Sequence, residues 1–161
     1  MRGRNVQELR ALRPRLERPA LTSGDGRGLG HANDDVRSPC TKALDHLVDR
    51  DSYAALVAMV HDPSLQVQIH ALHALACDRC KESEVPGGEE VLALALNSRR
   101  DDPDRHARAF AVELVGRFVH TAPEAAAGLV AACDGDCDPA VRKKAGWFAP
   151  GGTINRRMRP R

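Results

Sequence analysis

The chain has 161 residues, which suits one compact domain with extensions rather than several domains. Apolar residues make up 42%, yet there are only one Trp, one Tyr and three Phe, and the β-branched and aromatic runs that favour strands are missing. This composition predicts an all-α fold. No stretch approaches the ~18 apolar residues of a membrane span, and Arg13, Pro14 and Arg15 interrupt the first apolar stretch, so no signal peptide is expected. We therefore expect a cytoplasmic protein without membrane contact.

The net charge of +2 conceals an uneven distribution along the chain. Residues 1–30 carry seven Arg and three acidic residues, and residues 142–161 carry seven basic and no acidic residues. The intervening residues 31–141 carry ten basic and nineteen acidic residues. The charges either keep the surface solvated, or the basic ends attract a nucleic acid or an acidic partner.

The N-terminal residues 1–33 are predicted to form a flexible basic arm with one short helix at 6–13, because residues 14–33 hold two Pro and four Gly and show little periodicity. A single helix is predicted at 35–48. Three helical hairpins follow at 52–80, 88–119 and 123–149, and together these elements form a domain over 34–149. Residues 150–161 begin with Pro150-Gly151-Gly152 and are predicted to form an unstructured basic C-terminal tail.

Four segments within the predicted domain repeat one pattern. An apolar residue is followed four positions later by a small residue and seven and eight positions later by further apolar residues, which places them on one face of a helix. The segments are 36–44, 67–75, 107–115 and 141–149, with starts 31, 40 and 34 residues apart. A period of this size predicts stacked helical hairpins.

Asp-Pro precedes three of the four segments, at 62–63, 102–103 and 138–139. Asp can cap the free N–H groups of a helix, and Pro is tolerated at the first helical position. We therefore expect each Asp-Pro to open a helix. In the middle copies two extra residues separate Asp-Pro from the apolar position, so a register shifted to begin at Leu65 is also possible.

The repeat resembles the HEAT-repeat family, whose second helices begin Asp-Pro-x-Val-Arg with small residues four and seven positions after the Val. Residues 138–142 with Ala145 match closely, and Asp35-Val36-Arg37 with Cys40 matches without the Pro, whereas Gln68 replaces the Arg in the second copy. The chain is most similar to short bacterial HEAT-repeat proteins. The resemblance implies an α-solenoid of about three to four antiparallel helix pairs that binds a partner rather than performing chemistry.

One helix of the second hairpin carries a polar stripe between two apolar faces, which suits an inner helix facing a groove. The stripe holds Gln66, His70, His73, Cys77 and Cys80. Equivalent or nearly equivalent positions of the later repeats add further side chains. The predicted partner-binding groove therefore consists of His70, His73, Phe110, Glu113 and Lys144.

His73, Cys77 and Cys80 also form a candidate metal site, because His and Cys are good zinc ligands. The four His and Cys of the stripe span about 15 Å of straight helix, too far for bonds of roughly 2.1–2.3 Å to one ion. The helix would have to end near Cys77. We therefore expect polar groove residues and small apolar cysteines, with no cofactor.

A non-catalytic protein-binding module is the function that this pattern favours, and the acidic middle would prefer a partner with a basic surface. One alternative is a nucleic-acid-associated protein that works through the basic tail. Its residues would be Arg142, Lys143, Arg156, Arg157 and Arg159. A second alternative is a lyase-like or DNA-glycosylase-like enzyme on a HEAT-like scaffold. Trp147 is expected to pack against the last hairpin.

Overall fold

The computed structural model describes residues 28–46, 50–77 and 88–158, and this part of the chain contains seven α-helices, two 3-10 helices and no strand. The prediction of an all-α protein is confirmed. No helix in these ranges is long and apolar enough to cross a membrane. The elements are α2 (Asp34–Ala43), η2 (Leu44–His46), α3 (Arg50–Met59), α4 (Leu65–Ala76), α5 (Gly88–Asp101), α6 (Arg105–Gly116), α7 (Pro123–Gly135), α8 (Pro139–Phe148) and η3 (Asn155–Arg157).

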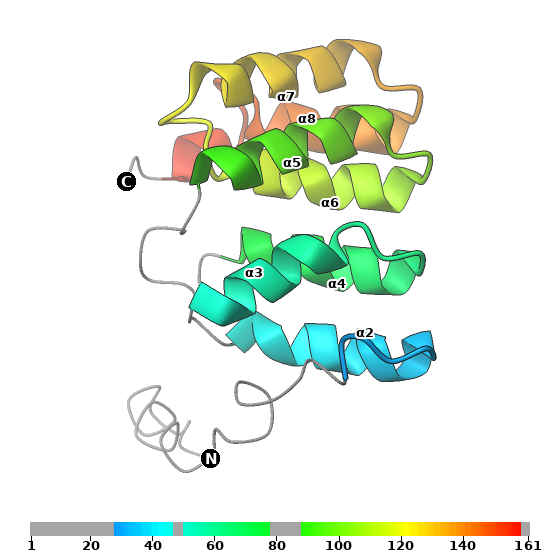
Figure 1. Cartoon of the computed structure of the whole chain (residues 1–161). Coiled ribbons are helices and arrows are strands. Elements are labelled where there is room, and N and C mark those ends of the chain that lie inside the picture. Colours follow the sequence, from blue (N-terminus) through cyan, green and yellow to red (C-terminus); the bar gives the residue numbers. More distant parts are fainter. Residues whose placement is uncertain (1–27, 47–49, 78–87, 159–161) are drawn as a thin grey trace, which may run out of the picture.

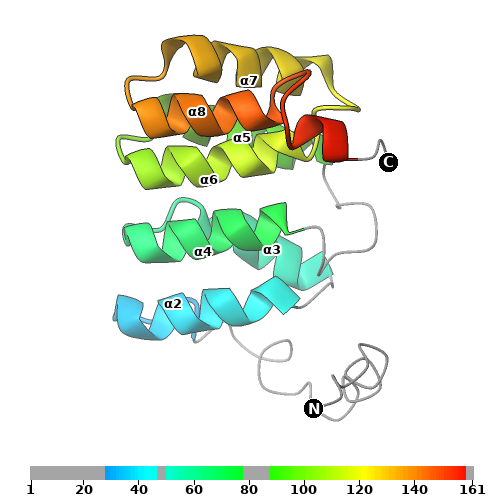
Figure 2. The ribbon, with the colours of Figure 1, turned by 180° about the vertical axis from the view of Figure 1, so that it is seen from behind.

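The helices form two layers (Figures 1 and 2). Helices α2, α4, α6 and α8 stack side by side in one layer, in the order of the chain (Figure 2). Helices α3, α5 and α7 form the other layer, where α3 packs on α4, α5 on α6 and α7 on α8. Helices occupy all four predicted ranges.

The stacked layer is held together by the residues of the repeated pattern. The third, seventh and eleventh residues after each helix cap are buried in α4, α6 and α8, and partly or fully buried in α2 and η2. At the seventh position Ala71, Ala111 and Ala145 have no exposed surface, and these small side chains let neighbouring helices approach closely. Leucine and valine on the flanking turns fill the remaining space, and each fully buried side chain contributes about 1.5–3 kcal/mol.

The start of α8 has the expected geometry. Asp138 is the cap, its carboxylate accepts hydrogen bonds from the N–H groups of Ala140 and Val141, and Pro139 is the first helical residue. A proline is tolerated there because the N–H that it lacks would have no partner inside the helix.

The expectation that Asp-Pro opens the other two helices is wrong. Ser64 caps α4 and Asp104 caps α6, so each Asp-Pro pair lies just before the cap. Asp62 and Asp102 accept the N–H of the cap residue at 2.8 Å, an aspartate turn that favours this position over the cap itself.

The alternative register that begins at Leu65 is also wrong. Val67 is fully buried and stands third after the cap Ser64, as Val141 stands third after Asp138. Leu65 is exposed. The two extra residues therefore belong to the loop, and the repeat keeps one register through all four stacked helices.

The expectation of an unstructured C-terminal tail is wrong for the residues up to Met158. The chain turns at Gly151, which has a φ of 81°, and forms η3 against the end of α8. The Ile154 N–H donates to the Trp147 carbonyl at 2.8 Å, and the buried Asn155 side chain accepts the Gly151 N–H at 3.1 Å. The first of these bonds gives a hydrogen-bond partner to a carbonyl in the last turn of α8, where the helix itself offers none.

At the other end of the chain, most of the predicted N-terminal arm lies outside the described residues. Residues 28–33 are described: Leu29 packs against the core, and the His31 and Ala32 carbonyls accept hydrogen bonds from Arg37.

Candidate partner-binding face

The predicted groove residues follow the register of the stacked helices. Counted from the caps, His70, Phe110 and Lys144 are each the sixth residue, and His73 and Glu113 are each the ninth. Residues three positions apart lie on the same side of a helix. Helices α4, α6 and α8 therefore present these side chains on one common face.

Four of the five side chains are joined into one group, which we name the α4–α6–α8 cluster: His73, Phe110, Glu113 and Lys144. The edge of the His73 ring meets the Phe110 ring, with centroids 5.9 Å apart and an interplanar angle of 87°. The Lys144 Nζ lies 4.8 Å from the centroid of the Phe110 ring, within the range of a cation–π interaction. Phe110 is thus held between an imidazole and an ammonium group that come from two other helices.

Glu113 completes the cluster through an ion pair with the Lys144 ammonium group. The Lys144 and Glu113 side chains are 19% and 27% exposed, so the pair is largely buried but still in contact with solvent. The carboxylate neutralises the lysine charge and fixes the lysine over the ring. The four side chains of the cluster are therefore linked to one another by contacts within the chain.

His70, the fifth predicted residue, lies outside the cluster and links α4 to α2. Its Nδ1 is 3.1 Å from the Ser38 Oγ and 3.2 Å from the Ser38 carbonyl oxygen, and its Nε2 is 3.0 Å from the Gln66 Nε2. A neutral imidazole with the proton on Nδ1 donates to the carbonyl and accepts from the amide. His70 therefore joins two helices of the stack.

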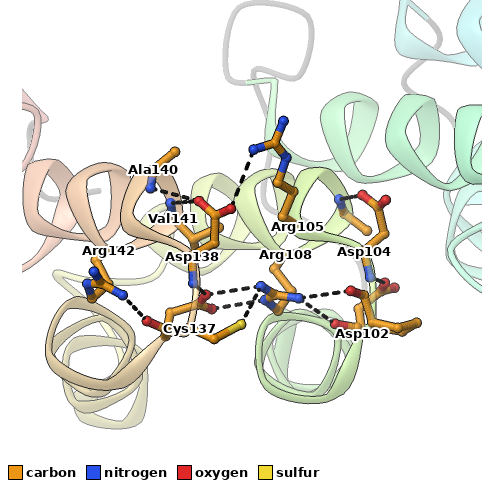
Figure 3. A network of polar contacts seen from close by, with 12 residues as sticks. Asp102, Asp104, Arg105, Arg108, Cys137, Asp138, Ala140, Val141 and Arg142 are labelled. Atoms are coloured by element: carbon orange, nitrogen blue, oxygen red, sulfur yellow. Dashed lines mark hydrogen bonds and ion pairs between the residues drawn. The ribbon is translucent and has the colours of Figure 1, made fainter.

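A buried ion pair joins α6 to the loop that opens α8 (Figure 3). The Arg108 guanidinium donates to both carboxylate oxygens of Asp136, at 3.0 and 3.1 Å, and to the carbonyls of Asp102 and Pro103, at 3.0 and 3.2 Å. The two charged side chains are only 8% and 5% exposed. One arginine thus ties the loop of its own hairpin to the loop of the next.

An ion pair of the same kind joins α2 to the loop that precedes α4. Arg37 donates to both carboxylate oxygens of Asp62, at 2.8 and 2.9 Å, and to two carbonyls of its own preceding loop. Each arginine is the fourth residue after its cap, and each aspartate lies two residues before the next cap. The same arrangement therefore recurs at two equivalent places in the stack.

These contacts lower the pKa of both aspartates. The hydrogen bond from Arg37 holds the pKa of Asp62 below its usual range, against the opposing effect of burial. Burial works against the charged form of Asp136, but hydrogen bonds from Arg108 and the Asp138 N–H outweigh it and lower the pKa. Neither pair was predicted from the sequence, where Asp62-Pro63 was expected to open a helix.

Two of the three residues proposed as metal ligands, His73 and Cys77, lie in the described part of the chain. The described part of the chain contains no group of three or more His, Cys, Asp or Glu side chains that could hold a metal ion. His73 is engaged with Phe110, and Cys77 is half-buried at the end of α4. Cys80 lies outside the described residues.

The residues proposed for nucleic-acid binding differ in their environment. Arg142 lies in α8, and its Nη1 donates to the Asp136 carbonyl of the α7–α8 loop at 2.5 Å (Figure 3). Lys143 is exposed, with its Nζ 5.8 Å from the centroid of the Trp147 ring, and Arg156 and Arg157 are exposed on η3. Arg159 lies outside the described residues.

Trp147 was expected to pack against the last hairpin, but it is not a core residue, because this side chain is 40% exposed. Trp147 is the ninth residue after the cap of α8, the position that His73 and Glu113 occupy in α4 and α6. The register therefore places it on the exposed face. Its neighbour Phe148 makes the packing contact, against Gly116 at the end of α6.

No protein-family model matches the chain, and no curated protein is similar enough to count as a match. The strongest features are the face with the α4–α6–α8 cluster and the repeated Arg–Asp pairs that hold the stack behind it.

Proposed function

We propose that the chain is a HEAT-like α-solenoid that acts as a non-catalytic protein-binding module. The shared register of α2, α4, α6 and α8 supports the repeat, since the same positions after each cap are buried. The two Arg–Asp pairs support it further, because they occupy equivalent positions between α2 and α4 and between α6 and α8. A stack of this kind offers a continuous surface built from one side of several helices.

The α4–α6–α8 cluster is the observation that carries the proposed binding site. It gathers an aromatic ring, an imidazole and an ion pair from three helices onto one face. Aromatic side chains supply much of the energy at protein interfaces, above all where they are held in place before binding. Phe110 is such a side chain, and a protein segment that covers it would exclude water from the cation–π contact and strengthen it.

A nucleic acid is the second candidate, and one observation favours it. Trp147 is exposed beside Lys143, and the exposed Arg156 and Arg157 lie on the η3 turn that follows α8. Bases stack on aromatic rings while basic groups hold phosphates. The enzyme hypothesis has no comparable observation in its favour.

Affinity capture from native lysate, with and without nuclease, separates the two candidates. The double variant His73→Ala/Lys144→Ala removes both groups that flank Phe110, and Arg156→Ala/Arg157→Ala removes two exposed side chains elsewhere as the control. We expect one dominant protein partner that resists nuclease, is lost with the first variant and is retained with the second. Capture that nuclease abolishes, and that the second variant reduces, would replace protein binding with nucleic-acid binding.

A further inference from the structure

A pocket of about 350 Å³ lies apart from the α4–α6–α8 cluster, where the end of α5 meets α6, the end of α7 and the α7–α8 loop. Three arginines line it: Arg99, Arg100 and Arg108. Asp136 and Cys137 form part of the remaining wall. A cation-rich pocket of this size can enclose a small anion, but it is too small for a folded partner.

Two of the three arginines already have a carboxylate partner. Arg108 is paired with Asp136 on both oxygens. Arg100 is exposed and donates to both oxygens of its neighbour Asp101, at 2.8 Å each. An exposed pair of this kind is weak, so Arg100 can leave Asp101 at little cost.

Arg99 is different, because its Nε is buried and has no hydrogen-bond partner among the described residues. Burial lowers the pKa of Arg99; the negative charge of Asp136 opposes this effect, and the positive charge of Arg100 adds to it. Asp136 is already engaged by Arg108 and cannot satisfy a second guanidinium in the same way. A desolvated donor without an acceptor is unfavourable, and an arriving oxyanion would relieve it.

We infer that this pocket binds a phosphate-class oxyanion, free or as the monoester of a small molecule, with Arg99 as its principal ligand. The planar guanidinium presents parallel N–H groups that match two oxygens of a phosphate. Arg100 supplies a second cation from the open side, while Arg108 stays on Asp136 and keeps the α7–α8 loop in place. The site is independent of the proposed partner-binding face.

Titration calorimetry of the full chain with inorganic phosphate and with glycerol phosphate tests the site. Arg99→Gln removes the principal ligand, and Lys42→Gln removes the same charge from the exposed surface of α2 as the control. We expect Arg99→Gln to weaken phosphate binding about tenfold or more, and Lys42→Gln to leave it unchanged. Tighter binding of glycerol phosphate would identify a monoester as the ligand, and equal binding would identify the free oxyanion.

Thermal unfolding without phosphate provides a second readout, because it shows whether the variant is folded. Arg99→Gln should unfold at the wild-type temperature or above it, since it removes a buried donor that has no acceptor. Phosphate should raise the unfolding temperature of the wild type and not that of the variant. Equal phosphate binding by wild type and Arg99→Gln, or no binding of either probe at millimolar concentration, would overturn the inference.

Discussion

The α6–α8 and α4–α6 junctions, the contacts between two neighbouring helices of the stack, have the same kind of loop before their second helix. They differ in how this loop is joined to the first helix. Both loops place an aspartate two residues before the helix cap, Asp136 in one and Asp102 in the other, and both aspartates accept the N–H of the cap residue. At the α6–α8 junction Arg108 reaches across to Asp136. The equivalent residue for Asp102 is Gln68, which carries no charge and cannot form an ion pair.

The α2–α4 junction follows the charged pattern, with Arg37 on Asp62. The chain therefore consists of two blocks with internal Arg–Asp links that meet at α4–α6. At this middle junction Arg117 donates to the Leu75 carbonyl and His73 meets Phe110, and buried apolar side chains of α4 and α6 belong to one core. The comparison shows that the ion pair is not needed for stacking, and that the middle junction depends on packing.

Truncation of the apolar contact at the middle junction should have the largest effect. Leu75 is fully buried in α4, and Leu75→Ala should lower the free energy of unfolding by about 4 kcal/mol, measured by urea denaturation, because it leaves a cavity between packed helices. Leu65→Ala on the same helix is the control, since Leu65 is 36% exposed, and it should have little effect. Equal losses for the two variants would show that α4 is packed in another register.

Removal of the charged link should have the next largest effect. Arg108→Ala leaves Asp136 buried without its cation and should lower the free energy of unfolding by about 3 kcal/mol. Gln68→Ala removes the equivalent side chain at the middle junction and should cost less than about 1 kcal/mol. Urea denaturation of the two variants compares the junctions directly, and similar losses would contradict the distinction between them.

Conversion of the middle junction to the charged type should stabilise the protein. Gln68→Arg places a guanidinium at the repeat position that faces Asp102, and it should raise the free energy of unfolding by about 1 kcal/mol. Combination with Asp102→Ala in a double-mutant cycle isolates the new pair. A gain that persists without the Asp102 carboxylate would mean that the arginine acts elsewhere.

The smallest effect concerns the pH dependence of stability. Asp62 and Asp136 have lowered pKa values in the folded chain. Their contribution is present above the unfolded-state pKa of about 4, and it is lost as the pH falls through the lower folded-state values. Arg108→Ala removes the cation on Asp136, so its stability should fall less steeply than that of wild type below about pH 4. Parallel acid-unfolding curves would contradict this assignment.

The sequence predicted the helices and their register because burial repeats at fixed spacing. Val67, Ala71 and Leu75 form one such set, and the same spacing recurs in α6 and α8. This periodicity also brought His73, Phe110, Glu113 and Lys144 onto one face, although it could not show that their side chains touch. Trp147 is the ninth residue after the cap of α8, as His73 and Glu113 are in α4 and α6, and this position could have indicated that its side chain is exposed.

The loops were harder to predict, because Asp-Pro has two different places in this chain. In Asp138-Pro139 the aspartate is the helix cap, whereas Asp102-Pro103 lies just before the cap. Local sequence does not distinguish the two without the register of the helix that follows. The Arg108–Asp136 pair joins residues 28 positions apart, and the Arg99 pocket combines residues of α5, α6, α7 and the α7–α8 loop, so neither has a local signal.

Hydrogen exchange of the chain alone and with its captured partner would show directly which face binds. We expect added protection in 65–76, 105–116 and 139–148, the helices that carry the α4–α6–α8 cluster, with little change in α3, α5 and α7. Protection confined to α7, or to the residues that follow α8, would contradict a partner-binding site on the stacked helices.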